Sequence, residues 1–175
     1  MGQSKNLNGL DVEGLRTAIA TVGAQPEAAR ARKAARVRWV DRLKFRAYLR
    51  NHSFEVDEPA SLAGEDASPT SMEYVLGALG TCLATGFVFN ATQRGIAIRN
   101  LELALESTQE NYFVFLGLTP AGHPGFDQVG VKLYVQADAD ESALREIWEH
   151  TVRTSPVGNS LGKSVAIRAD LDVIP

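Results

Sequence analysis

The 175-residue sequence predicts an α+β protein, because helix-like and strand-like hydrophobic patterns occupy separate runs of one chain. Two observations support this expectation most directly. Apolar and polar residues alternate in several segments, which is typical of strands with one solvated face. In addition, residues 74–93 are twenty consecutive uncharged residues, and this run predicts a long helix enclosed in the core.

The N-terminal region is expected to be helical from residue 9 to residue 33. Apolar residues recur there at helical spacing, and Pro26 is suited to begin a second short helix. Residues 30–36 are locally basic, but such a run usually forms a solvated helix face. The net charge of −3 also gives no positive field that would attract nucleic acid, so no nucleic-acid partner is expected.

From Arg36 the pattern changes to a period of two, which predicts a hairpin that turns near residues 41–42. Phe54 and Val56 indicate a third strand. Residues 57–69 contain two prolines and four acidic residues and are expected to form a loop.

The long helix is expected to start with a capping box of Thr70 and Glu73 and to end at Gly95. A membrane-spanning helix needs about 20 mainly apolar residues. This run is interrupted by glycine, threonine, asparagine and glutamine, so we expect a helix that is buried inside the protein. No membrane partner is expected. Its small residues would allow another backbone to approach closely.

The C-terminal half alternates between strand and helix signals. A long strand with a slip near Asn100 is followed by an apolar segment, 111–118, that fits a strand or a lid. Next come a strand over 129–135 and an amphipathic helix that begins at Asp140 and ends at Ser155-Pro156. The alternating segment 165–173 predicts a last strand.

The sequence contains none of the common nucleotide-binding, serine-hydrolase or zinc-protease motifs. Its three histidines, His52, His123 and His150, lack zinc-ligand spacing, so no metal and no other cofactor is expected. A pair of Cys82 with His52 or His123 stays open, because such partners meet only in the fold. One cysteine and no apolar leader fit a reducing, cytoplasmic location.

Two segments carry a family resemblance. Residues 57–84, DEPASLAGEDASPTSMEYVLGALGTCLA, resemble the signature of the osmotically inducible protein C (OsmC) family, which includes the organic hydroperoxide resistance (Ohr) proteins. RTSPV, residues 153–157, resembles the second motif of that family. NLNGLDVEGL, residues 6–15, is similar to a helical extension of one branch. The resemblance therefore divides the chain into an extension, 1–35, and an OsmC-like domain, 36–175.

The resemblance implies curved antiparallel sheets wrapped around a central cysteine-bearing helix in an intertwined homodimer. It also implies thiol-dependent reduction of organic hydroperoxides, a stress-response activity, in which Cys82 matches the cysteine that attacks the peroxide. Within the family an arginine and a glutamate orient that cysteine and favour its thiolate. No cofactor takes part. The enzyme would be a hydroperoxide reductase of peroxiredoxin-like activity.

The sequence departs from the family pattern at two expected catalytic positions. Ser155 stands where the family has its second, resolving cysteine, and Met72 stands where it has the glutamate. Glu73 lies nine residues before Cys82, half a turn from its face, which favours a capping role over a catalytic one. Arg46 and Arg50 are both candidates for the arginine, although their strand face could equally be solvated.

Three interpretations of Cys82 follow. It could run a one-cysteine cycle in which an external thiol is the reductant. Alternatively, the chain could be a non-catalytic homodimer that binds a small apolar ligand near Cys82. Finally, Cys82 could be an inert packing residue. The aromatic residues that could line an apolar site are Phe87, Phe89, Tyr112, Phe113 and Phe115.

Overall fold

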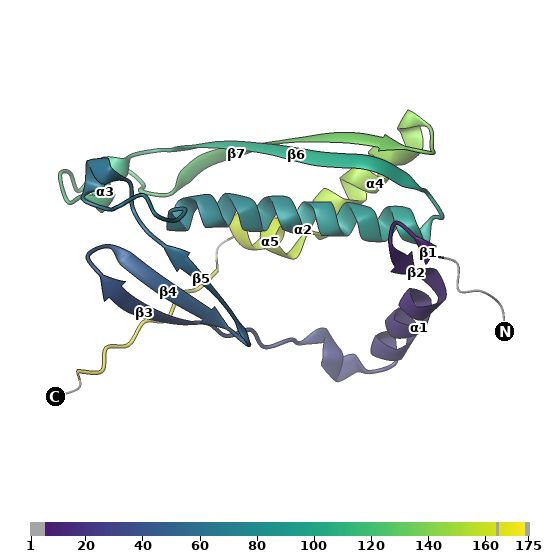
Figure 1. Cartoon of the computed structure of the whole chain (residues 1–175), viewed down its shortest axis with the longest axis horizontal. Coiled ribbons are helices and arrows are strands. Elements are labelled where there is room, and N and C mark those ends of the chain that lie inside the picture. Colours follow the sequence, from purple (N-terminus) through teal and green to yellow (C-terminus); the bar gives the residue numbers. More distant parts are fainter. Residues whose placement is uncertain (1–5, 164, 174–175) are drawn as a thin grey trace.

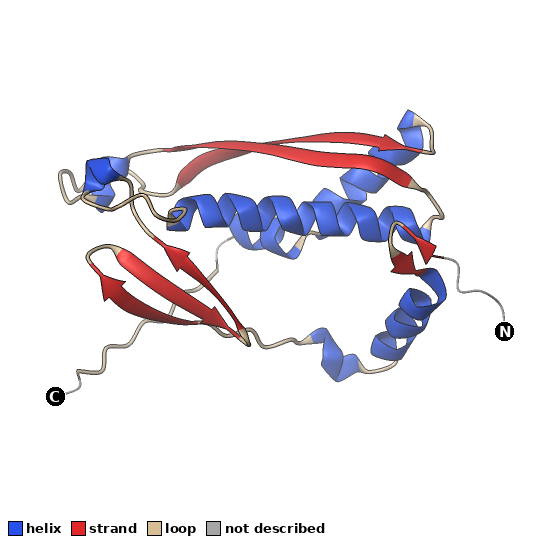
Figure 2. Ribbon diagram, in the orientation of Figure 1, coloured by secondary structure: helices blue, strands red, loops and turns tan. Residues whose placement is uncertain are grey.

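The computed structural model describes residues 6–163 and 165–173, which form a mixed α+β fold (Figures 1 and 2). Its centre is α2 (Ser71–Gln93), a helix of 23 residues. An antiparallel hairpin of β6 (Ile98–Gln109) and β7 (Phe126–Ala137) runs along this helix. The predicted α+β class is confirmed, and so is the slip near Asn100, where the β6–β7 register shifts.

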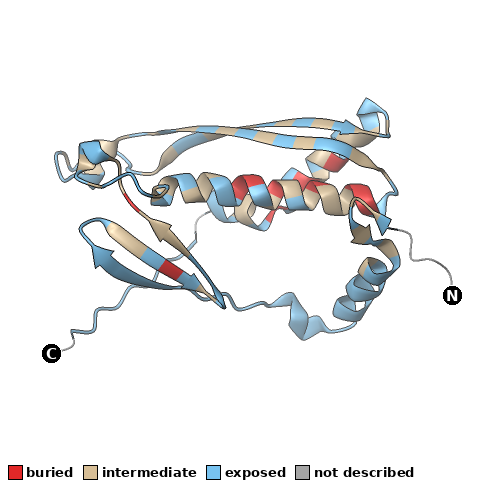
Figure 3. Cartoon of the chain, viewed as in Figure 1, coloured by how far each residue is buried: buried red, intermediate tan, exposed pale blue. Residues whose placement is uncertain are grey.

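Two further helices, α4 (Glu141–Thr154) and α5 (Pro156–Leu161), also pack against α2. Figure 3 shows that buried residues concentrate on α2 and α4. The fully buried cluster is Phe87, Ala91 and Ile147, and it is surrounded by partly buried residues of the hairpin and α4. The core of the single chain is therefore the contact between α2, α4 and one face of the hairpin.

Both predicted ends of the central helix are confirmed. The Thr70 hydroxyl accepts a hydrogen bond from the Glu73 backbone N–H, and the Glu73 carboxylate accepts one from the Thr70 N–H at 2.7 Å. Gly95 follows the helix with a φ of 75°, a left-handed conformation that favours glycine. By length and composition alone α2 could also cross a membrane, a test that the core helix of a soluble protein passes equally.

Two glycines of α2 leave room for side chains of neighbouring elements. A Cβ added to Gly80 would lie 2.8 Å from a methyl of Leu105, and one added to Gly86 would lie 3.0 Å from a methyl of Thr151. These two glycines therefore let β6 and α4 pack closely on the helix.

The N-terminal helix is shorter than predicted. Residues 6–11 form a small hairpin, because Asn8 and Gly9 both adopt positive φ at its turn. Helix α1 (Val12–Gly23) follows, and Pro26 begins a 3-10 turn, as expected. The hairpin strands are β1 (Asn6–Leu7) and β2 (Leu10–Asp11), and the 3-10 turn is η1 (Pro26–Ala29).

The next three strands form a separate antiparallel sheet in the order β3-β4-β5. They are β3 (Arg36–Asp41), β4 (Lys44–Leu49) and β5 (His52–Val56), with a predicted turn that is confirmed near Arg42. Figure 1 shows this sheet apart from the β6–β7 hairpin, beyond α2. A 3-10 turn, η2 (Ala60–Leu62), lies in the loop that leads to α2.

Three expectations for the C-terminal half were incomplete or wrong. The apolar segment contains a short helix, α3 (Tyr112–Phe115), because the Asn111 side chain accepts a bond from the Phe113 N–H and starts a helical turn. The chain continues as α5 after Ser155. Residues 165–173 are extended but form no strand, since no neighbouring strand pairs with them within the described chain (Figure 2).

Candidate functional site

The thiol of Cys82 lies next to the hydroxyl of Ser155. The Cys82 Sγ and Ser155 Oγ atoms are 3.3 Å apart, although the two residues are 73 positions apart in sequence. Cys82 is half-buried on α2, whereas Ser155 is only 4% exposed at the α4–α5 junction. The fold thus brings together the two positions that the family motifs single out.

The α4–α5 junction holds Ser155 in place. Its hydroxyl accepts a hydrogen bond from the Gly158 N–H at 3.1 Å and thereby caps α5. Pro156 occupies the first turn, where it removes no needed donor. The Asn159 amide donates to the carbonyls of Arg153 and Ser155, both at 2.9 Å. Because its oxygen already accepts from Gly158, the hydroxyl hydrogen of Ser155 can be donated to the Cys82 sulfur.

A groove of about 370 Å³ opens beside Cys82. Its lining comprises Thr81, Cys82, Thr85, Gly86, Phe89 and Pro156. The Thr81 hydroxyl donates back to the helix carbonyl of Gly77 at 2.9 Å, so it is occupied within α2. None of the lining residues carries a formal charge, so the single chain presents a sulfur in an apolar, uncharged groove.

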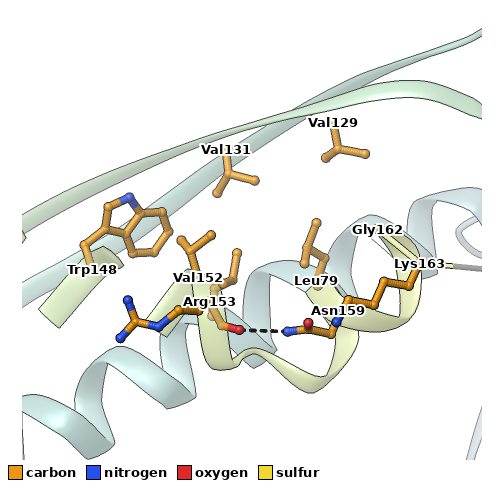
Figure 4. Close-up of a pocket in the computed structure, with 11 residues that line it drawn as sticks. Leu79, Val129, Val131, Trp148, Val152, Arg153, Asn159, Gly162 and Lys163 are labelled. Carbon is orange, nitrogen blue, oxygen red and sulfur yellow. Dashed lines mark hydrogen bonds between the residues drawn. The ribbon is translucent and has the colours of Figure 1, made fainter. Parts of the chain in front are cut away.

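A second, larger cavity of about 620 Å³ lies between β7 and the helices, and neither Cys82 nor Ser155 is among its described lining residues (Figure 4). Its walls are mainly apolar, and Gly158 and Asn159 belong to both this cavity and the α4–α5 junction. Figure 4 shows the hairpin valines above and the helical residues below. The apolar lining residues are Leu79, Leu83, Val129, Val131, Trp148 and Val152, and the two cationic ones are Arg153 and Lys163.

The charged candidates predicted from the sequence lie elsewhere in the chain. Arg46 on β4 forms an ion pair with Glu55 on β5, the residue opposite it in the ladder, and this pairing raises the arginine pKa. Arg50 lies at the β4–β5 turn with a φ of 57°. Within the described chain, no hydrogen bond or ion pair joins either arginine to Cys82.

Glu73 and Met72 lie at the start of α2, nine and ten residues before Cys82 respectively. The carboxylate of Glu73 is held by the backbone N–H and hydroxyl of Thr70, and these bonds lower its pKa. Met72 lines a different cavity. The structure therefore places Glu73 in the helix cap and does not bring it to Cys82.

The aromatic candidates do not converge on one site within the chain. Phe87 is fully buried in the core, Phe89 lines the groove beside Cys82, and Tyr112 and Phe115 line a cavity at the start of α2. No group of three or more His, Cys, Asp or Glu residues among those described could hold a metal ion.

Neither α5 nor the cavity of Figure 4 was predicted from the sequence. The helix could have been found, since a serine followed directly by proline is a common N-terminal helix signal. The cavity had no such signal, because only the fold brings α2 and β7 together with the consecutive helices α4 and α5.

Comparisons with known proteins identify the family and the fold. The sequence model described as OsmC-like protein matches residues 64–170. An OsmC-like protein from Mycoplasma pneumoniae shares the fold with a TM-score of 0.65 at 13% identity, over 75% of this chain and 88% of that one. No protein of curated function matches the sequence.

Two further solved structures share the fold at low identity. An organic hydroperoxide resistance protein OsmC from Legionella pneumophila aligns with a TM-score of 0.54 at 12% identity, over 75% of this chain and 89% of that one. An organic hydroperoxide resistance protein from Elizabethkingia anophelis aligns with a TM-score of 0.53 at 14% identity, over 75% and 88%. The family match covers more than half of the sequence, including Cys82 and residues 153–157, and the chain belongs to the OsmC-like protein family.

Proposed function

We propose that the chain is a redox protein of the stress response that reduces organic hydroperoxides through Cys82. The observation that supports this most directly is the 3.3 Å approach of the Ser155 hydroxyl to the thiol. A hydrogen bond donated to sulfur stabilises negative charge on it, and the thiolate is the nucleophile. The open apolar groove on the same helix face would admit the organic part of a hydroperoxide.

The chemistry balances without a cofactor. The Cys82 thiolate attacks the terminal peroxide oxygen, the S–O bond forms as the O–O bond breaks, and the leaving alkoxide takes a proton and departs as alcohol. Sulfur is oxidised by two electrons to sulfenic acid. One external thiol then forms a mixed disulfide and releases water. A second thiol restores Cys82 and leaves as an external disulfide.

We also propose that the working form is a homodimer. Only 33% of the most apolar 18-residue window of α2 is buried within the chain. The β3–β5 sheet exposes apolar side chains too, with Trp39 at 68% exposure. A second copy would cover both surfaces, and it could carry Arg46 or Arg50 to the uncharged groove of its partner. A cytoplasmic location would supply the external thiol.

The domain division proposed from the motifs is 1–35 as an extension and 36–175 as the OsmC-like domain. The extension is not a free tail, because Asn8 hydrogen-bonds to Thr92 and to the backbone of Ile96 and Ile98. It therefore braces the C-terminal end of α2.

Mass spectrometry after hydroperoxide treatment tests the proposed activity. Cumene hydroperoxide together with dimedone should label Cys82, and a small dithiol should sustain repeated consumption of peroxide. Cys82→Ser should abolish both signals, while Ser160→Ala, an exposed hydroxyl on α5, should retain them. An unmodified Cys82 in folded protein after excess hydroperoxide would refute the proposal.

The cavity of Figure 4 favours one alternative, a non-catalytic homodimer that binds a small apolar ligand near Cys82, against Leu79 and Leu83 of the same helix. Its apolar walls and its volume of about 620 Å³ suit a small molecule. The same experiment separates the two functions, since a binding protein would show no dimedone adduct and no peroxide turnover.

A further inference from the structure

A separate cavity of about 550 Å³ lies at the N-terminal end of α2. Three segments enclose it: the 58–62 loop, the first turn of α2 and the tip of the β6–β7 hairpin. Pro59, Leu62, Met72, Phe115 and Pro124 give it a largely apolar lining. Cys82 is not part of that lining, and it lies about 15 Å from Met72 along the helix axis.

The loop wall presents Glu58 on a rigid base. The Glu58 backbone N–H donates to the carboxylate of Asp57 at 2.8 Å, and its carbonyl accepts from the Asp66 N–H at 3.1 Å. Gly64 packs directly on this carbonyl, where an added Cβ would lie 1.7 Å from the oxygen. The position of the Glu58 backbone is thus fixed from both sides.

The Glu58 carboxylate has no polar partner among the described residues, with which it makes no hydrogen bond or ion pair. Its acidic neighbours Asp57 and Glu73, in contrast, both accept hydrogen bonds from backbone N–H groups. Lys44 is already paired with Glu65 at 2.8 Å. Burial, and then repulsion by Asp57 and Glu73, raises the pKa of Glu58. A cation bound beside Glu58 would stabilise the ionised carboxylate against both effects.

The opposite wall is aromatic and equally well anchored. The ring centroids of Tyr112 and Phe115 are 5.6 Å apart, so the two rings pack against each other. Asn111 fixes their backbone, since its amide oxygen accepts from the Phe113 N–H and its amide nitrogen donates to the Ala121 carbonyl at 2.9 Å. An apolar ligand body can pack on this wall while its charged end reaches the carboxylate.

We propose that this cavity binds an amphiphilic amine, whose ammonium group pairs with Glu58 and whose apolar body packs against Leu62, Met72 and Phe115. Among the described lining residues, Glu58 is the only one with a carboxylate and none has a cationic side chain. The cavity therefore selects a cation over an anion of the same shape. This binding needs no reaction at Cys82 and is independent of the proposed peroxide chemistry.

Calorimetric titration with three probes of matched chain length tests the proposal: hexylamine, hexan-1-ol and hexanoate. Hexylamine should bind one molecule per chain, hexan-1-ol more weakly, and hexanoate without measurable heat. Glu58→Gln should weaken hexylamine binding by about tenfold or more and leave hexan-1-ol unchanged, because only the amine loses a charged partner. Phe115→Ala should weaken both.

Two controls keep the outcome specific. Glu149→Gln removes an exposed carboxylate of α4 and should leave hexylamine affinity unchanged. Cys82→Ser should also leave it unchanged, so failure of the peroxide activity would not affect this result. Circular dichroism melting would verify that each variant is folded. The proposal would be overturned if hexylamine did not bind, if Glu58→Gln bound hexylamine as tightly as the wild type, or if hexanoate bound as tightly as hexylamine.

Discussion

The hydroxyl of Ser155 bonds to two parts of the structure at once, the Gly158 N–H of α5 and the sulfur of α2. A serine can cap a helix, but it cannot form a disulfide. The position therefore combines a structural role with proximity to the thiol. Because the two residues are this close, a cysteine placed at position 155 tests whether the two family motifs can form a dithiol pair.

Ser155→Cys should restore a dithiol pair. The present 3.3 Å separation needs only a small local movement to reach disulfide geometry. One equivalent of hydroperoxide should oxidise Cys82 to sulfenic acid, which the new thiol then converts to an intramolecular disulfide with loss of water. Thiol titration should show both thiols lost.

Ser160→Cys, on the exposed side of α5, is the matched control and should keep its added thiol. Two free thiols in the oxidised Ser155→Cys variant, under conditions where wild-type Cys82 reacts, would contradict the expected closure.

Asp57 is a second residue with a large local effect. Its side chain is 1% exposed and accepts hydrogen bonds from the backbone N–H groups of Glu58, Glu65 and Ala67. Burial alone would raise its pKa, but the three N–H donors outweigh burial and lower the pKa below its usual 3.8. The ionised form is therefore the one that holds the loop.

Because the pKa of Asp57 is lower in the folded state than in the unfolded state, its ionised carboxylate stabilises the fold. This contribution is complete above the pKa of the unfolded state and is lost as the pH falls through the pKa of the folded state. The melting temperature of the wild type should therefore carry an acid-dependent component that begins near pH 4 and grows below it. Asp57→Asn should melt lower at pH 7 and lack this component. Equal acid dependence in both proteins, followed by circular dichroism, would contradict the assignment.

At the scale of elements, α2 is braced at both ends by side chains. Thr70 and Glu73 cap its start, and Asn8 of the β1–β2 hairpin meets its end. The Asn8 amide donates to the Thr92 hydroxyl and the Ile96 carbonyl, both at 2.9 Å, and its oxygen accepts from the Ile98 N–H. The extension thus joins the helix to the first residue of β6.

Asn8→Gly should remove these three bonds while it keeps the positive φ of 53° accessible. Urea unfolding should show a loss of about 1–3 kcal/mol, the usual cost of part-buried polar groups left without partners. Asn6→Gly, in an exposed position of β1, should cost less. A stability equal to that of the wild type would show that the extension does not brace α2.

Local signals predicted most of the elements well. The capping box, the two-residue period of β3–β5 and the strict alternation of β7 are short-range patterns, so the sequence alone sufficed. The pairing of Cys82 with Ser155 was expected only through the family motifs. The ion pair of Arg46 with Glu55 and the bonds of Asn8 depend on tertiary contacts that no local pattern encodes.

At the scale of the whole molecule, the single chain leaves large apolar surfaces uncovered. Val37, Trp39 and Val40 of β3 are exposed, and only 33% of the apolar window of α2 is buried. A monomer with such surfaces would be prone to self-association. The predicted last strand, residues 165–173, also lacks a strand to pair with inside its own chain.

Sedimentation velocity at micromolar concentration should show a dimer. Trp39→Glu should shift the distribution towards monomer, because it places a charge in the exposed apolar face of β3. Thr17→Glu, on the exposed surface of α1, should leave the dimer intact. A folded wild-type monomer at this concentration would contradict the homodimer.

The extended segment 165–173 has a practical consequence for handling the protein. Its alternating side chains are highly exposed, with Ile167 at 90%, and its backbone groups pair with no strand of the described chain. An affinity tag fused after this segment would lie beside exposed backbone groups that are free to pair with a strand of another chain. Purification handles therefore belong at the N-terminus, ahead of the hairpin that Asn8 anchors.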